Sequence, residues 1–184
     1  PLIEINKMPM FLRAKRLLPR SKKNIFVVKE EISEIIESHL NANLKNEDNL
    51  VLTLNHTPEG QALTTSKGIV NCIKSKSINI SACDHGIFYN KRKFEKLIEN
   101  NLYDIIIWSK KDYIPAIKNP EMYGWISYEG NNISKVFVKR MPHDFNNKAV
   151  IIGTFTFRNT EIFNRCLDSL IQRKGKVNGE YYID

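Results

Sequence analysis

The sequence lacks any apolar run near the roughly 20 residues that a bilayer-crossing helix needs, and its first residues do not form a secretory signal. Cysteine is scarce. Cys72, Cys83 and Cys166 have neither metal-ligand nor disulfide spacing, which predicts reduced thiols in a cytoplasmic protein with no membrane partner. Internal repeats, low-complexity tracts and long linkers are also missing. We therefore expect one domain over 1–184, and we interpret the abrupt ends of the chain as those of a fragment of a longer protein.

Acidic side chains are outnumbered, with 20 Asp and Glu against 28 Lys and Arg, a net charge of +8. Such a domain can bind nucleic acid, an anionic membrane or small phosphorylated ligands. The densest basic cluster, at 13–23, is interpreted as a solvated helix face and loop because no recognised nucleic-acid motif accompanies it. We therefore predict no nucleic-acid partner.

Helical and strand patterns alternate along the first two thirds of the chain. The predicted helices are 10–18, 30–40, 61–73 and 91–101, and the predicted strands are 24–29, 50–54, 78–83 and 104–109. This alternation favours an α/β fold with a mostly parallel sheet. After Pro120 the pattern changes to a hairpin at 123–139 around "EGNN", a strand at 149–157, and a helix at 159–174 that Asn159 or Thr160 can cap.

The strand at 78–83 runs into a carboxylate, Asp84. In open α/β sheets, ligands bind beyond the carboxyl ends of the strands, where a carboxylate can hold Mg²⁺. A turn or helix cap within "DHG" explains Asp84 equally well. Asp184 also ends an apolar and aromatic run, so the two aspartates could converge on one cation, and the sequence leaves open whether they do.

Two other places offer weaker signals. The turn "TPEG" ends on Gly60, and the N–H groups at the start of the following helix could receive a phosphate or a base edge. An ordinary strand-to-helix connector is the more common alternative. Lys139 shares a strand face with Phe137, and an exposed strand-end lysine is the usual case. The histidines suggest no zinc site, and no Ser/His/Asp or Cys/His arrangement can be argued.

Several stretches taken together resemble the sugar-phosphate nucleotidyltransferases, or nucleotide-sugar pyrophosphorylases, of the bacterial capsule and surface-polysaccharide type. In chain order they are "PLIEINKMPMFLRA", "TPEGQALT", "ACDHGIF", "MYGWISYEGNNISKVFVKRMP", "IIGTFTF" and "NGEYYID". They follow the order of the family across nearly the whole chain. The glycine-rich signature of the family is not present, and the glutamate of its "EKP" segment is replaced, since Val138 precedes Lys139.

The resemblance implies a glycosyltransferase-A-like, Rossmann-related fold, a three-layer α/β/α arrangement with a mostly parallel mixed sheet. It implies transfer of CMP or UMP from CTP or UTP to a sugar phosphate, with release of pyrophosphate, for polysaccharide precursors. It also implies site residues: Asp84 and Asp184 for Mg²⁺, Gly60, Gln61 and Thr57 for the nucleotide, Gly124 and Glu180 for the sugar, and Lys139 as the catalytic cation against a phosphate.

Two alternatives stay open. The chain could be a non-catalytic nucleotide- or sugar-binding module of this fold, or a cytidylyltransferase that acts on a non-sugar phosphate. The sequence decides neither the nucleotide and the acceptor nor whether the chain forms a homo-oligomer.

Overall fold

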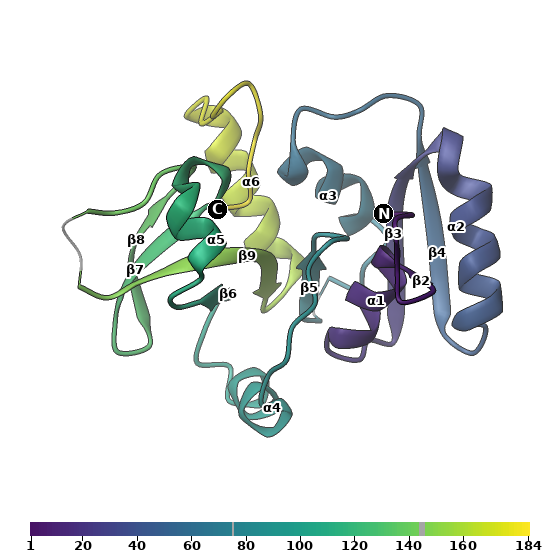
Figure 1. The fold of residues 1–184 in the computed structure, drawn as a ribbon, viewed down its shortest axis with the longest axis horizontal. Helices are drawn as coiled ribbons and strands as arrows, with labels where there is room; N and C mark the ends of the chain where they lie inside the picture. Colours follow the sequence, from purple (N-terminus) through teal and green to yellow (C-terminus); the bar gives the residue numbers. More distant parts are fainter. Residues whose placement is uncertain (75, 144–145) are drawn as a thin grey trace.

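The structure, a computed structural model, describes residues 1–74, 76–143 and 146–184. Its helices are α1 (Met10–Leu17), α2 (Glu30–Asn43), α3 (Gln61–Ile69), α4 (Lys91–Glu99), α5 (Ile114–Lys118) and α6 (Thr160–Gln172), with a 3₁₀ turn η1 (Pro120–Met122). Its strands are β1 (Glu4–Ile5), β2 (Met8–Pro9), β3 (Lys23–Lys29), β4 (Asp48–Leu54), β5 (Ile78–Ser81), β6 (Ile105–Lys110), β7 (Trp125–Glu129), β8 (Asn132–Phe137) and β9 (Lys148–Phe157) (Figure 1). Every helix and strand that the sequence predicts is therefore present, with shifted ends.

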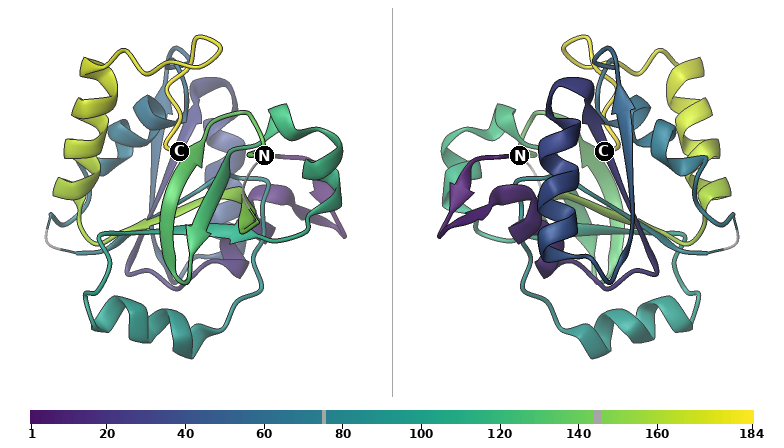
Figure 2. Two further views of the ribbon diagram at one scale, coloured as in Figure 1. Left: turned by 90° about the vertical axis from the view of Figure 1, so that its left-hand side faces the viewer. Right: turned by 90° about the vertical axis from the view of Figure 1, so that its right-hand side faces the viewer.

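The strands form a mixed α/β architecture, which confirms the predicted α/β class, although most of the described strand pairs are antiparallel and not parallel as predicted. β3 and β4 pair in parallel, from Lys23 opposite Asp48 to Lys29 opposite Leu54. β9 pairs antiparallel with β5, β6 and β7, and β8 extends the sheet beyond β7. Within the described ranges, the parallel pairing is limited to β3 with β4, because β9 lies between strands that run opposite to it. Figure 2 shows the β3–β4 pair and the five-stranded sheet of β5 to β9 from the sides, with helices packed around them.

Helices cover both faces of the β3–β4 pair. On one face, α1 and α2 bury Phe11, Leu12 and Ile36 against the strands. On the other face, Gly68 of α3 lies against Ile25 and Val27. This close approach leaves little room for a side chain at position 68, so a helix-weakening glycine is tolerated there. The result is a layered fold in which the carboxyl ends of β3 and β4 lead into α2 and α3.

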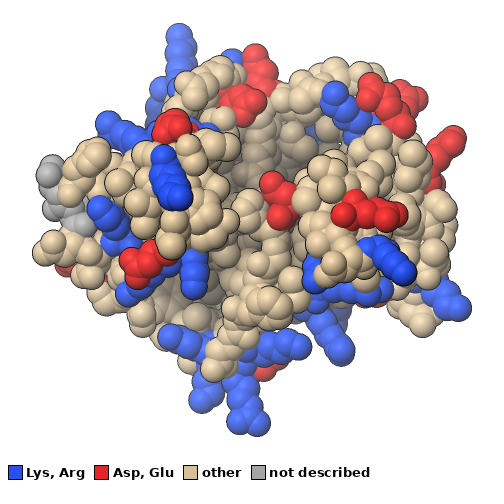
Figure 3. Space-filling view, viewed as in Figure 1, with Lys and Arg blue, Asp and Glu red and all other residues tan. Residues whose placement is uncertain are grey.

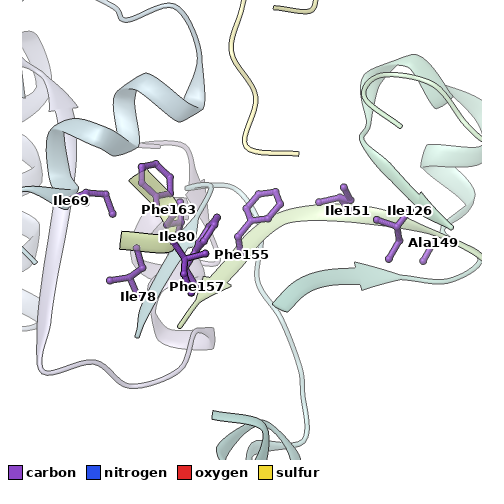
Figure 4. Close-up of a cluster of buried hydrophobic side chains, with 10 residues drawn as sticks. Ile69, Ile78, Ile80, Ile126, Ala149, Ile151, Phe155, Phe157 and Phe163 are labelled. Carbon is purple, nitrogen blue, oxygen red and sulfur yellow. The ribbon is translucent and has the colours of Figure 1, made fainter. Parts of the chain in front are cut away.

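The main core joins α3, the five-stranded sheet of β5 to β9, and α6. It consists of Ile69, Ile78, Ile80, Ile126, Ala149, Ile151, Phe155, Phe157, Ile162 and Phe163 (Figure 4). Burying each of the larger side chains contributes about 1.5–3 kcal/mol. The side chain of Asn159 accepts a hydrogen bond from the Ile162 N–H at 2.9 Å, which makes Asn159 the N-cap of α6, one of the two caps that the sequence offers. This core fixes β7 and β9, which carry part of the site described below.

None of the described helices combines the length and the apolar character that a bilayer-spanning helix requires.

Candidate functional site

Asp184 lies against the backbone of Gly124, the residue that precedes β7. A side chain at position 124 would overlap the Asp184 carboxylate, so this contact requires glycine. The Gly124 carbonyl oxygen accepts a hydrogen bond of 2.8 Å from the Ile151 N–H of β9, which ties this loop to the sheet. Burial raises the pKa of the Asp184 carboxyl above its usual range, although a backbone hydrogen bond and the charge of Lys139 act against the rise. Two residues predicted for different ligands, the metal and the sugar, are thus in direct contact.

Lys139 lies beside this pair. Its ammonium donates a 2.9 Å hydrogen bond to the carbonyl oxygen of Met122, and it lies 4.8 Å from the centre of the Tyr182 ring. A cation over an aromatic face within about 6 Å is attracted by the ring quadrupole. The Lys139 charge also influences the Asp184 carboxyl. Lys139, Gly124 and Asp184 therefore form one cluster, which we call the Lys139 cluster.

Glu180 joins this cluster indirectly. A hydrogen bond with Glu180, together with burial and the Asp184 charge, raises the pKa of the Tyr182 phenol to about 12. At neutral pH the phenol is therefore protonated, and it donates a hydrogen bond to the Glu180 carboxylate. The structure places the predicted sugar-side residue Glu180 next to Tyr182, a residue for which the sequence reasoning assigned no role.

The turn before α3 contacts the same C-terminal segment. Tyr181 donates its backbone N–H to the Glu59 carbonyl at 2.9 Å, and its own carbonyl accepts from the Ala62 N–H at 3.0 Å. Gly60 has a φ of 105°, and a Cβ there would lie 2.5 Å from the Tyr181 carbonyl oxygen. The close backbone approach predicted for Gly60 is made by the protein itself. A nucleotide contact at Gly60 or at Gln61, the first residue of α3, stays a prediction.

Thr57 lies in the same connection and is exposed. It lines a cavity of about 270 Å³ at the carboxyl ends of β3 and β4, together with Lys29, Glu30, Glu31, Leu54, Asn55 and His56. Figure 3 shows that the surface is hollowed between the part that carries β3 and β4 and the part that carries β7 to β9. The cavity that Thr57 lines lies beyond the carboxyl ends of the parallel strands β3 and β4, a position that suits a small-molecule site.

Asp84 has a different set of partners. Its carboxylate lies 2.7 Å from Nδ1 of His85, and this hydrogen bond lowers the pKa of Asp84 and raises that of His85. The next residue, Gly86, packs against Leu17 of α1. Asp84 is therefore an exposed residue at the end of β5 with its own partner, and a shared cation with Asp184 stays a prediction.

The aspartates are chemically suited to Mg²⁺. Within the described ranges, no group of three or more His, Cys, Asp or Glu side chains is placed to hold a metal ion. Mg²⁺ in nucleotide sites is commonly bound by only one or two carboxylates, with waters and substrate phosphates completing its shell. Partial burial raises the pKa of Asp184 because it disfavours the charged form, and a bound cation would favour that form again.

Tyr181, Tyr182 and the Met122 carbonyl are the contacts that sequence reasoning missed. The side chains of residues 181 and 182 could have been noticed as adjacent aromatics before Asp184. No pattern in the sequence marks a backbone carbonyl such as that of Met122, since any residue type supplies one.

Solved structures of similar architecture are found for nearly the whole chain. The inositol-1-phosphate CTP transferase from T. maritima is 15% identical over 89% of this chain and 62% of its own, with a TM-score of 0.68. A protein from Bacillus anthracis assigned as a glucose-1-phosphate thymidylyltransferase is 14% identical over 99% of this chain and 70% of its own, with a TM-score of 0.71. The chain has the nucleotidyltransferase fold.

A third structure of this fold has another activity in its name. The mannose-6-phosphate isomerase from Helicobacter pylori is 15% identical over 91% of this chain and 69% of its own, with a TM-score of 0.72. The chain spans 62% of the length of the inositol-1-phosphate CTP transferase and about 70% of the other two. No protein-family model and no curated protein matches the sequence. The resemblance seen in the sequence is thus matched by the fold, and the activity has to be argued from the site.

Proposed function

We propose that this chain belongs to a nucleotidyltransferase that transfers a nucleoside monophosphate from CTP or UTP to a sugar phosphate and releases pyrophosphate. The observation that supports this most is the Lys139 cluster. It combines a cation, a partly buried carboxylate with a raised pKa, and Gly124, whose missing side chain lets that carboxylate lie against the backbone. Phosphate chemistry needs charge neutralisation of this kind, and the fold shared with a CTP transferase agrees with it.

In the proposed reaction, a phosphate oxygen of the acceptor attacks the α-phosphorus of the nucleotide. The new P–O bond forms as the bond from the α-phosphorus to the bridging oxygen breaks, and pyrophosphate leaves. Positioning and electrostatic stabilisation supply most of the catalysis in such transfers. Lys139 would neutralise a phosphate oxygen, and Mg²⁺ held by Asp84 and Asp184 would balance the triphosphate charge.

The remaining assignments follow the same proposal. The turn of Thr57, Gly60 and Gln61 would receive the nucleotide, and Gly124 and Glu180 would face the sugar. The product would serve capsule or surface-polysaccharide synthesis in the cytoplasm. A non-sugar acceptor phosphate uses the same chemistry at Lys139, so the acceptor class is an outcome of the experiment.

The deciding experiment measures pyrophosphate release with each of the four nucleoside triphosphates against a pool of sugar phosphates and other small phosphates. It is run with residues 1–184 and with the longest natural protein that contains them, with Mg²⁺ and with Mg²⁺ removed by a chelator. Release that requires Mg²⁺, one nucleotide and one acceptor is expected. Nucleotide binding without release for any pair would refute the enzyme proposal and favour a non-catalytic binding module.

A further inference from the structure

The ammonium of Lys139 is held from two directions by groups of the protein. The Met122 carbonyl accepts its hydrogen bond at 2.9 Å, and the face of the Tyr182 ring lies 4.8 Å away. A lysine side chain loses about 2 kcal/mol of rotamer entropy when it is fixed. A lysine that must meet a phosphate at one place therefore gains from partners that fix it before the ligand arrives.

The backbone of Lys139 also suggests a fixed position. Its φ of 56° is left-handed, a conformation that costs a residue with a Cβ about 1–2 kcal/mol. β8 ends at Phe137, so this turn comes two residues after the strand. Strained residues persist where their surroundings hold them, and here the contacts with Met122 and Tyr182 contribute to that.

Tyr182 is itself well anchored. Its neighbour Tyr181 makes two backbone hydrogen bonds to the turn before α3, and the Tyr182 phenol interacts with Glu180. Two residues further on, Asp184 lies against Gly124. The ring is therefore fixed on both sides along the chain, and it can act as a support for a flexible partner.

We propose that Tyr182 is a positioning residue whose ring holds the Lys139 ammonium where it meets the phosphate groups of a ligand. The inference rests on the proposed function, because that function assigns the phosphate to Lys139. The proposal assigns different roles to the ring and to the hydroxyl group of Tyr182. The ring supports Lys139, whereas the hydroxyl only supports the ring through Glu180.

The kinetic test is a double-mutant cycle on pyrophosphate release. Tyr182→Leu removes the ring and should lower kcat/KM by about 3- to 30-fold, the range expected for a partly desolvated cation–π contact. Tyr182→Phe keeps the ring and should stay within about twofold of the wild type. In a Lys139→Met background, loss of the ring should cost less than about twofold, because its partner is gone. Additive losses would overturn the inference.

A matched control removes the aromatic ring of another lysine–tyrosine pair. Lys111 lies 4.9 Å from the centre of the Tyr128 ring on β7, so Tyr128→Leu deletes a ring under a lysine outside the Lys139 cluster. Its kcat/KM should stay within about twofold of the wild type. A loss equal to that of Tyr182→Leu would show a general effect of removing aromatic side chains and would count against the inference.

Binding of inorganic pyrophosphate gives a readout that does not require turnover. Titration followed by NMR should show about 3- to 30-fold weaker binding for Tyr182→Leu and near-wild-type binding for Tyr182→Phe. In the free protein, the ε-methylene protons of Lys139 should show a ring-current shift that only Tyr182→Leu abolishes. Equal pyrophosphate affinity in the wild type and in Tyr182→Leu, or no binding in the wild type, would overturn the inference. Ring-dependent binding without any turnover would refute the proposed function alone.

Discussion

A single methyl group at Gly124 would test the position of Asp184 most directly. In Gly124→Ala, the added Cβ would lie 2.8 Å from the Asp184 Cγ and 3.2 Å from the Ile151 Cδ1, and it would overlap the nearer carboxylate oxygen. Ordinary contact begins near 3.4 Å, so the Cγ must retreat by at least about 0.6 Å, the difference between 3.4 and 2.8 Å, and the oxygen must move further. The φ of Gly124 lies outside the left-handed region, so the alanine backbone itself is not strained.

The expected losses differ in size for stability and activity. Because Asp184 is only partly buried and can yield, the free energy of unfolding should fall by only about 1 kcal/mol, the low end for overpacking. Because a displacement of about 1 Å in a catalytic arrangement can cost about 100-fold, kcat/KM for pyrophosphate release should fall by about that factor.

Initial rates and urea unfolding measure the two effects of this substitution. The control places Gly124→Ala in an Asp184→Ala background, where the methyl group no longer meets a carboxylate and the stability loss should shrink. A Gly124→Ala variant with kcat/KM within about threefold of the wild type would refute the placement of Asp184 in the reacting geometry.

Three further predictions concern stability. Asp184→Asn removes a partly buried carboxylate whose pKa is raised by burial, so its ionisation weakens the folded state as pH rises above about 4. The variant should be about 0.5–2 kcal/mol more stable than the wild type at pH 7, equally stable in acid, and inactive; equal stability at pH 7 would contradict this. His85→Ala should lose at most about 1 kcal/mol, because the pair with Asp84 is exposed. This loss should be greatest between about pH 4 and 6.5 and should disappear as pH falls through the lowered pKa of Asp84 or rises through the raised pKa of His85, whereas a loss independent of pH would exclude an ionic pair. Gly60→Ala should lower the free energy of unfolding in urea by about 2–4 kcal/mol, because the new Cβ would overlap the C-terminal segment and the φ of 105° strains an alanine. The control Gly130→Ala, at a φ of 58° in open space, has only the backbone strain and should cost about 1–2 kcal/mol. Equal losses would show that the overlap at Gly60 is absent.

The long helices and strands of this fold could be predicted because their buried apolar residues recur at a regular spacing along the sequence. In α6, apolar residues recur at helical spacing and Asn159 caps the first turn, as the sequence indicates. The short elements β1, β2 and α5 were not predicted. Strands of two residues and a helix of five residues that begins next to a proline are too short to show a period.

The site could be predicted only as separate residues. Gly124, Lys139 and Asp184 come from three segments, and their meeting depends on how β7, β8 and the C-terminal segment pack. The sequence suggested a ligand contact for Gly60, whereas the packing partner in the structure is the backbone of Tyr181. Local sequence does not encode which of two close approaches, by a ligand or by the chain, a glycine permits.

The C-terminal segment explains why the site and the core depend on each other. Tyr181 and Ile183 pack into a small apolar cluster with Ala62 and Leu170. The alternate residues of this segment have other partners: Glu180 interacts with Tyr182, Tyr182 lies under Lys139, and Asp184 lies against Gly124. Side chains that alternate in this way put one set into the core and the other into the site, so a shift of one residue would exchange the two sets. The apolar residues therefore fix the register in which the polar ones reach Lys139, and the packing of this segment is a condition for the chemistry proposed there.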